Sequence, residues 1–285
     1  MGISQTVCTV DTSECAVIGL ESSGGTACRL TACKTFPFGI GELVSDKGKR
    51  LLKKVARQVG KIKSEEMVLC IAPETYLPLP AYFPAGADPA QYQELCRMEA
   101  EYFLNKPDDY SCDVTGYGEM TESLHEKKLL LFYPAEPCRT VSDMFSAQYP
   151  VRFSCSPHLS LLQLSLYENK PLATLELENN YFLLSISKHG RLEKFICRQV
   201  KSREEAVFFT IKELSGNPLL RETGVQITGS RADKSIITLI GKETSLKTKP
   251  LGIPSSIPIS NLEKFSVSSP AAVKAISTAL MAFRK

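Results

Sequence analysis

The sequence predicts an α/β fold made of two similar halves, and three observations carry this prediction. First, two strand–turn–strand segments, residues 8–21 and 175–190, lie roughly one domain apart. Each has an acidic residue at its first bend, Asp11 or Glu176, and each leads through a glycine-containing turn into another strand. Second, strand-like and helix-like segments alternate in both halves, which is typical of sheets covered by helices. Third, 285 residues with 43% apolar side chains suffice for large packed cores.

The first half is expected to open with paired strands, an amphipathic helix and a short buried strand. Their expected positions are residues 7–21, 26–36, 46–60 and 67–72. Prolines recur between 73 and 89, and proline cannot donate a backbone hydrogen bond, so this stretch is expected to be mostly extended loop. Asp88 then caps a helix and Pro89 fills its first turn. That helix is expected to reach about Asn105.

The rest of the chain continues the alternation. Further strands are expected near 110–117, 128–133, 151–155 and 224–229, and helices near 136–147, 157–168, 203–214, 231–241 and 269–284. Residues 250–260 are rich in proline and serine and are expected to form a loop. We therefore divide the chain into a first lobe, 1–169, with a subdomain inserted at about 73–127, and a second lobe, 170–285. The terminal helix is expected to pack back toward the first lobe.

Composition excludes several classes of function. The net charge of +3 is too small to indicate nucleic-acid binding. Basic residues gather between Lys47 and Lys54, with apolar residues between them at helical spacing. A solvated helix face explains this cluster, and contact with acidic membrane lipid is the alternative. The longest apolar stretch, 129–133, is far shorter than the roughly 20 residues that a membrane helix needs, so no direct membrane insertion is expected.

The ten cysteines are scattered without any C-x-x-C pair, and the chain has only three histidines. This spacing does not fit a structural metal site, so no metal is expected. Several cysteines lie in strand-like apolar runs, as Cys70 does, and are expected to behave as small buried hydrophobic residues in a reducing cytoplasm. His158 follows Ser156-Pro157 at a helix start, where we expect a cap or a partly exposed ring. No catalytic residue is assigned, because no Ser-His-Asp or Cys-His arrangement is visible.

Four parts of the chain are similar, in order and spacing, to one known family. Val10-Asp11-Thr12-Ser13 is similar to the first phosphate hairpin of that family, and Glu176–Arg191 is similar to the second. Glu99–Phe103, with the acids at 108–113, is similar to the small inserted subdomain. Ile227-Thr228-Gly229-Ser230 is similar to the adenosine turn, and 270–284 to the terminal helix. Together they resemble the PilM-type proteins of type IV pilus assembly. These proteins belong to the actin-like superfamily, with Hsp70 and the sugar kinases.

This resemblance implies the actin-like ATPase fold, with two ribonuclease H-like lobes and a small subdomain inserted in the first. It also implies a nucleotide site between the lobes. There, acids position hydrated magnesium and small residues let backbone N–H groups approach the phosphates. The positions of this sequence that match the site are Asp11, Ser13, Glu176, Gly229 and Ser230.

The second hairpin departs from the family pattern at its turn. The family has aspartate, an apolar residue, glycine and a small residue, whereas this chain has Glu176-Leu177-Glu178-Asn179. Two unit charges about 4 Å apart repel by about 4 kcal/mol at an effective dielectric near 20, so Glu178 opposes a bound triphosphate. Ile18 also stands where the family often has a lysine. We therefore expect no cofactor and no ATP turnover, and Mg-ATP is kept as the alternative.

The functional surface is therefore expected to bind protein. The resemblance implies a cytoplasmic scaffold of an envelope assembly system, of the type IV pilus or type II secretion kind. A groove between the first lobe and its subdomain would accept the cytoplasmic tail of a single-span inner-membrane partner. Candidate contact residues are Tyr82, Phe83, Leu95 and Tyr102, although each could instead belong to the core of the subdomain. Self-association of the scaffold is a further possibility.

Two other functions stay open at this point. The first is a working Mg-ATP-binding ATPase or kinase of the same superfamily, for which Asp11 would be a metal ligand. The second is a structural paralogue unrelated to pili, which binds a cell-division or surface-polysaccharide component.

Overall fold

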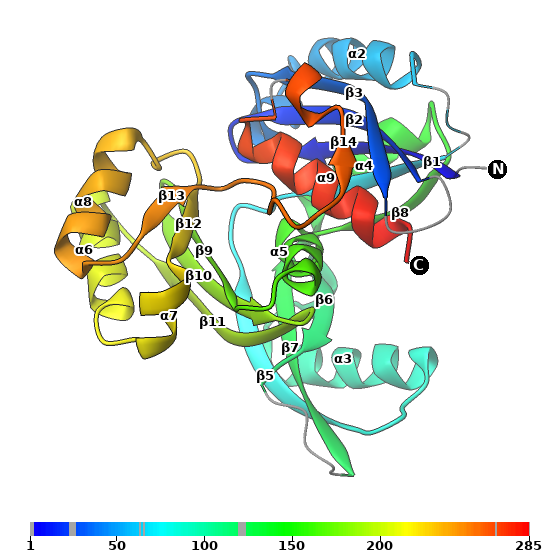
Figure 1. The fold of residues 1–285 in the computed structure, drawn as a ribbon. Helices are drawn as coiled ribbons and strands as arrows, with labels where there is room; N and C mark the ends of the chain where they lie inside the picture. Colours follow the sequence, from blue (N-terminus) through cyan, green and yellow to red (C-terminus); the bar gives the residue numbers. More distant parts are fainter. Residues whose placement is uncertain are drawn as a thin grey trace.

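The structure is a computed structural model of the whole chain, and it describes residues 3–22, 27–62, 64, 66–118, 124–265 and 267–284. The turn expected at 22–25 after the first hairpin lies outside this part, apart from Ser22. Three sheets organise the fold, each with helices against it (Figure 1).

The first sheet has the strand order β14-β3-β2-β1-β4-β8. Its strands are β1 (Ile3–Val10), β2 (Cys15–Ser22), β3 (Cys28–Phe36), β4 (Met67–Ile71), β8 (Val151–Cys155) and β14 (Ile259–Ser260). The second sheet has the order β11-β10-β9-β12-β13. Its strands are β9 (Leu172–Leu177), β10 (Tyr181–Lys188), β11 (Arg191–Gln199), β12 (Val225–Thr228) and β13 (Thr248–Pro250). The third sheet, β5-β7-β6, consists of β5 (Leu77–Pro84), β7 (His125–Pro134) and β6 (Tyr110–Gly116).

The first two sheets repeat one design. In each, three consecutive strands pair antiparallel, and the first of the three also pairs in parallel with a later strand, β1 with β4 and β9 with β12. A further parallel strand, β8 or β13, completes the series. We call the first sheet with its helices the first lobe, the second sheet with its helices the second lobe, and the third sheet with its helix the subdomain. Because β1 and β9 are equivalent, the residues at their carboxyl ends occupy equivalent places.

Nine α-helices and three 3-10 helices are present in the described part of the chain. They are α1 (Ile40–Leu43), α2 (Gly48–Val59), α3 (Pro89–Phe103), α4 (Ala135–Ser146), α5 (Pro157–Leu161), α6 (Arg203–Leu214), α7 (Pro218–Thr223), α8 (Lys234–Thr244), α9 (Pro270–Ala282), η1 (Pro107–Asp109), η2 (Leu162–Tyr167) and η3 (Leu262–Lys264). The expected start of α3 is confirmed, because Asp88 Oδ1 accepts from the Gln91 N–H at 2.8 Å and Pro89 fills the first turn. None of the described helices is long and apolar enough to cross a bilayer.

The prediction that residues 73–89 are mostly extended loop is wrong, because strand β5 lies within this stretch. β5 pairs with β7 from Leu77↔Phe132 to Pro84↔His125, despite three prolines in the strand. It is an edge strand of its sheet, and an edge strand has one side without ladder hydrogen bonds, so proline is tolerated there. The sequence also gave no sign of α7, and the helix expected at 157–168 divides into α5 and the 3-10 helix η2.

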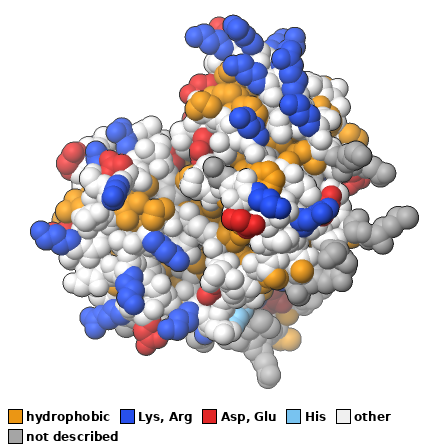
Figure 2. Space-filling model, turned by 45° about the horizontal axis from the view of Figure 1, so that its top comes forward, with side chains coloured by type: hydrophobic (Ala, Val, Ile, Leu, Met, Phe, Trp, Pro, Cys, Tyr) orange, Lys and Arg blue, Asp and Glu red, His pale blue; other side chains and the backbone are white. Residues whose placement is uncertain are grey.

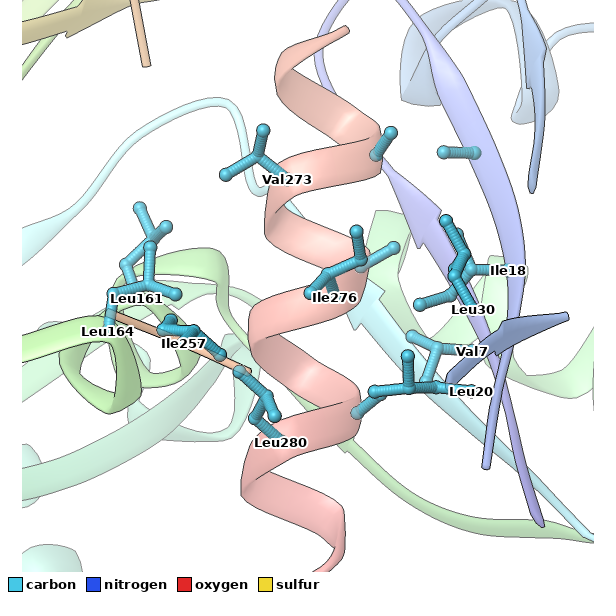
Figure 3. Packing of buried hydrophobic residues seen from close by; sticks show 14 of the residues in the cluster. Val7, Ile18, Leu20, Leu30, Leu161, Leu164, Ile257, Val273, Ile276 and Leu280 are labelled. Atoms are coloured by element: carbon cyan, nitrogen blue, oxygen red, sulfur yellow. The ribbon is translucent and has the colours of Figure 1, made fainter. Parts of the chain in front are cut away.

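Helix α9 lies against the first sheet, although it is the last element of the chain (Figure 1). Figure 3 shows Val273, Ile276 and Leu280 of α9 between two sets of apolar side chains. Strands of the first sheet supply Val7, Ile18, Leu20 and Leu30 on one side, and α5 and η2 supply Leu161 and Leu164 on the other. All twelve residues from Ala271 to Ala282 are buried. This packing determines the direction in which each side chain of α9 points.

Candidate functional site

The two acids predicted at the hairpin bends take different places in their hairpins. The prediction for Glu176 is wrong, because Glu176 pairs with Leu183 inside the ladder of β9 and β10. Glu178 holds the place that Asp11 has in the first hairpin: the Asp11 N–H donates to the Glu14 carbonyl, and the Glu178 N–H donates to the Tyr181 carbonyl.

Asp11 directly follows β1, and Glu176 is the penultimate residue of β9. Both side chains are buried: Asp11 is 4% exposed and Glu176 is 2% exposed. Away from solvent, a charge is costly unless a counter-charge accompanies it.

Lys274 of α9 supplies that counter-charge to both acids. Its Nζ lies 2.7 Å from Asp11 Oδ2 and 3.0 Å from Glu176 Oε1, and its side chain is fully buried. One ammonium group thus joins a carboxylate of the first lobe to a carboxylate of the second. We call Lys274, Asp11 and Glu176 the interlobe network.

The turn that carries Asp11 also fixes the helix that carries Lys274. Glu14, at the other end of this turn, accepts hydrogen bonds from the Ser269 hydroxyl and from the Ala271 N–H, both at 2.8 Å. A carboxylate at the N-terminus of a helix satisfies free N–H groups and interacts favourably with the helix dipole. Two acids of one turn, Asp11 and Glu14, therefore hold α9 at its first and second turns.

His158 joins the interlobe network through Glu176. Its Nε2 lies 3.1 Å from Glu176 Oε2, and its ring packs edge-on against Tyr76 at a centroid distance of 4.8 Å. The expectation of a cap or a partly exposed ring is wrong, because His158 is 4% exposed. Residues 157–161 do begin a helix at this point, but the helix packs against α9, β4 and β6 and is mostly buried.

The charges of the network stabilise one another. Burial alone would raise the pKa of Glu176, but Lys274 and His158 outweigh burial and lower this pKa to about 2. Burial alone would lower the pKa of Lys274, but Asp11 and Glu176 raise it well above its ordinary value. Lys274 and Glu176 are therefore both charged at neutral pH.

Glu178 is also buried, and it binds the loop that the resemblance assigns to adenosine. Its carboxylate accepts from the Ser230 N–H at 3.1 Å and from the Ser230 hydroxyl at 2.6 Å. Gly229 has φ +105°, and a Cβ there would lie 2.3 Å from the Leu177 carbonyl oxygen. Burial, and after it the charge of Glu176, raise the pKa of Glu178 to about 7, against the effect of Ser230. The second hairpin and the glycine–serine loop are thus in direct contact.

The five residues matched to a nucleotide site do not form one site in this structure. Asp11 and Glu176 meet through Lys274, and Gly229 and Ser230 meet the second hairpin at Glu178. Ser13 is exposed in the β1–β2 turn. The lysine ammonium already lies between the two acids that would position magnesium, and no group of three or more metal-ligand side chains occurs among the described residues. The residues present therefore do not fit Mg-ATP.

Sequence reasoning missed Lys274 and its role. The signal was present, because Lys274 is the single charged residue of α9, in a helix that is otherwise apolar, small or hydroxylic on every side. A helix that is hydrophobic all round is buried, and a lysine in such a helix needs a partner. The spacing of residues along the helix does not identify which acid that partner is.

A groove lies on the subdomain, and Arg139 of α4 contributes to it from the first lobe. It has a volume of about 960 Å³ and is lined by residues of α3, η1, β6, β7 and α4, including Gln93, Cys112 and Arg139. None of the four residues predicted to bind a partner lines this groove. Tyr82 and Tyr102 are 67% and 83% exposed, Leu95 lines a separate hollow, and Phe83 belongs to the core of the subdomain.

Comparison with known proteins identifies the fold through its similarity to solved structures. No protein-family model matches the chain, and no curated protein sequence matches it. Among solved structures, a chain titled as the PilM-PilN type IV pilus biogenesis complex is similar with a TM-score of 0.70. The match covers 97% of this chain and 98% of that chain at 12% identity.

Two further structures agree with this result. A protein of Bacteroides thetaiotaomicron with an actin-like ATPase fold and unknown function is similar at TM-score 0.52 and 11% identity, over 96% of this chain and 95% of that one. The cytoplasmic domain of EpsL, an inner membrane component of the type II secretion system of Vibrio cholerae, is similar at TM-score 0.50 and 10% identity, over 100% and 96%. This chain therefore has the actin-like ATPase fold that the sequence predicted.

Replacing Lys274 tests the interlobe network. Lys274→Met keeps the length of the side chain but leaves two buried carboxylates without a counter-charge, so we expect a loss of about 3–5 kcal/mol in the free energy of unfolding. Urea denaturation measures it. The triple variant Asp11→Asn/Glu176→Gln/Lys274→Met removes all three charges and is expected to recover much of this loss. Lys212→Met, at an exposed lysine, should change stability by less than about 0.5 kcal/mol. Equal stability of Lys274→Met and wild type would contradict the network.

The raised pKa of Glu178 predicts a dependence of stability on pH. Between its ordinary value of 4.5 and about 7, the folded protein keeps a proton on Glu178 that the unfolded chain releases. This contribution to the free energy of unfolding is complete below the ordinary value and is lost as pH rises through about 7. Glu178→Gln lacks this titration. We therefore expect the stability of wild type relative to Glu178→Gln to fall between about pH 5 and pH 8. The variant at exposed Glu243, Glu243→Gln, serves as the control, and a constant difference across this range would contradict the assignment.

Proposed function

We propose that this chain is a nucleotide-independent, PilM-type scaffold on the cytoplasmic side of an envelope assembly system. One observation carries the proposal: the Lys274 ammonium lies within 3.0 Å of the acids of both lobes, buried from solvent. A lysine is part of the chain and does not dissociate, whereas a nucleotide or metal ion exchanges with solution. The two lobes are thus joined by a permanent cation, with no dependence on ATP.

The partner we propose is the cytoplasmic tail of a single-span inner-membrane protein. The groove on the subdomain supports this proposal by its size and by its walls. Tyr92, Val114 and Phe132 give the groove apolar walls, and an extended peptide can place its side chains in an apolar groove of this kind. The similar structures include a complex named PilM-PilN and an inner membrane component of a secretion system, which supports the same class of partner.

The electrostatics of the groove favour a tail that carries both signs of charge. Arg97 and Arg139 line it together with Glu101 and Asp108. Arg97 forms salt bridges with Glu94 and Glu101 on the exposed surface of α3, at 2.7 Å and 3.3 Å. Exposed ion pairs of this kind contribute little to stability, so they can exchange partners with a bound peptide at low cost.

Titration with Mg-ATP tests whether the site works without nucleotide. We expect isothermal calorimetry of the wild type to show no saturable heat up to about 1 mM ATP, because the Lys274 ammonium lies between the two acids. A Kd of about 1 mM corresponds to a binding free energy of about −4 kcal/mol, and any binding of ATP should be weaker than this. Saturable binding that is lost in Asp11→Asn and kept in Asp46→Asn would support an ATPase or kinase instead. Asp46 is exposed and lies outside the interlobe network, so its variant is the matched control.

Filling the groove tests the docking surface. The probe is a synthetic peptide with the sequence of the cytoplasmic tail of the single-span protein whose gene adjoins the gene of this chain. Gln93→Trp places an indole in the groove from α3 and is expected to weaken peptide binding at least about tenfold, or about 1.4 kcal/mol, in fluorescence anisotropy. Met98→Trp puts the same group on an exposed part of the same helix outside the groove and should bind as the wild type does.

The proposed docking surface fails if both tryptophan variants bind the peptide equally well. If the wild type binds no tail peptide, the proposed class of partner is wrong.

A further inference from the structure

Helix α2 presents a strongly basic face to solvent. Seven cationic side chains and no acidic ones occur from residue 47 to residue 61, and all seven are exposed: Lys47, Lys49, Arg50, Lys53, Lys54, Arg57 and Lys61. Figure 2 shows Lys and Arg side chains gathered at the top of the molecule, the end at which α2 lies in Figure 1. Without these seven residues, the formal net charge of the chain would change from +3 to −4. We call this set the basic face of α2.

The folded chain does not use these charges for its own stability. The opposite side of α2 is anchored by Leu52, Val55 and Val59 in the core of the first lobe. Within the described part of the chain, none of the seven cations of the basic face forms a salt bridge. The core therefore positions the helix, and the basic face remains available to an external partner.

The arrangement of these charges is also unfavourable for an isolated helix. Lys47 is the N-cap, it makes no capping hydrogen bond, and no acid lies in the first turn, where the helix dipole favours negative charge. Like charges also recur four residues apart, as between Lys49 and Lys53 and between Lys53 and Arg57, and such pairs repel. An anionic surface outside the chain would relieve both kinds of repulsion.

We propose that the basic face of α2 lies on the anionic headgroups of a lipid bilayer. Charge complementarity selects the occupant, since polybasic surfaces are attracted to membranes that contain acidic lipids. Exposed Val44 and half-buried Leu51 border the face and can contact the headgroup region. A nucleic acid is less well matched, because the face offers no aromatic side chain for stacking, and its single amide, Gln58, is half-buried.

This inference goes beyond the proposed scaffold function and does not depend on the groove. The groove is formed with α3, which lies at the other end of the molecule from α2 in Figure 1. Contact with lipid and contact with a partner tail would thus use different surfaces. Loss of one need not affect the other, so the two proposals can fail separately.

Vesicle flotation of the full chain tests the proposal. Vesicles of phosphatidylcholine, with or without about 40% phosphatidylglycerol, are mixed with protein at about 50 mM and about 300 mM NaCl. We expect binding to the anionic vesicles at the lower salt concentration, at least a tenfold decrease at the higher one, and no binding to neutral vesicles. The variant Lys49→Glu/Lys53→Glu/Lys54→Glu/Arg57→Glu should lose binding while it keeps the circular dichroism and urea midpoint of a folded protein.

A matched variant separates the basic face from net charge. Lys212→Glu/Lys242→Glu/Lys247→Glu/Lys249→Glu makes the same change in charge at exposed lysines of the second lobe and should bind anionic vesicles as the wild type does. Equal loss in the two variants, binding to neutral vesicles, or no binding to anionic vesicles would each overturn the proposal. Tighter binding to a DNA duplex than to anionic vesicles at the same salt concentration would assign the face to nucleic acid and would also overturn it.

Discussion

The structure depends on one buried lysine that forms ion pairs with two carboxylates from different lobes. Lys274 reaches Asp11 and Glu176 across the interface, and the apolar packing of α9 holds the lysine there. The lysine carries one positive charge against two carboxylates, so removing it would leave negative charge uncompensated away from water, which is among the most destabilising changes in a protein interior. The relative position of the lobes is thus coupled to the stability of the core.

This arrangement differs from a site for an exchangeable ligand. Asp11 follows β1 and Glu176 lies in β9, the corresponding strand of the other half, but a covalently attached cation lies between the two acids. Glu178 adds a second contact, because it binds Ser230 and so brings the loop after β12 against the second hairpin. A buried ion pair or hydrogen bond favours the arrangement that makes it, since another arrangement leaves its polar groups unpaired. A body held in this way suits a scaffold whose shape is constant.

The surfaces proposed for binding lie away from the interlobe network. The groove beside α3 is bordered by an edge strand, and the basic face of α2 lies at the opposite end of the molecule (Figure 1). Both are supported from beneath by packed cores, Ala81, Phe83 and Leu130 under one and Leu52, Val55 and Val59 under the other. Rigid support of this kind keeps the lining side chains in place, which reduces the entropy lost on binding.

The sequence by itself determined the two-fold α/β plan, Asp11 at the first bend and the capped start of α3, because periodicity, turn residues and caps are local properties. It did not indicate β5, because proline argues against a strand unless that strand is known to lie at an edge. Only the tertiary structure decided which charged groups meet at the site. Lys274 is 263 residues from Asp11 and 98 from Glu176, and the packing of a helix that is apolar all round, not any local pattern, selects the side chains that its lysine meets.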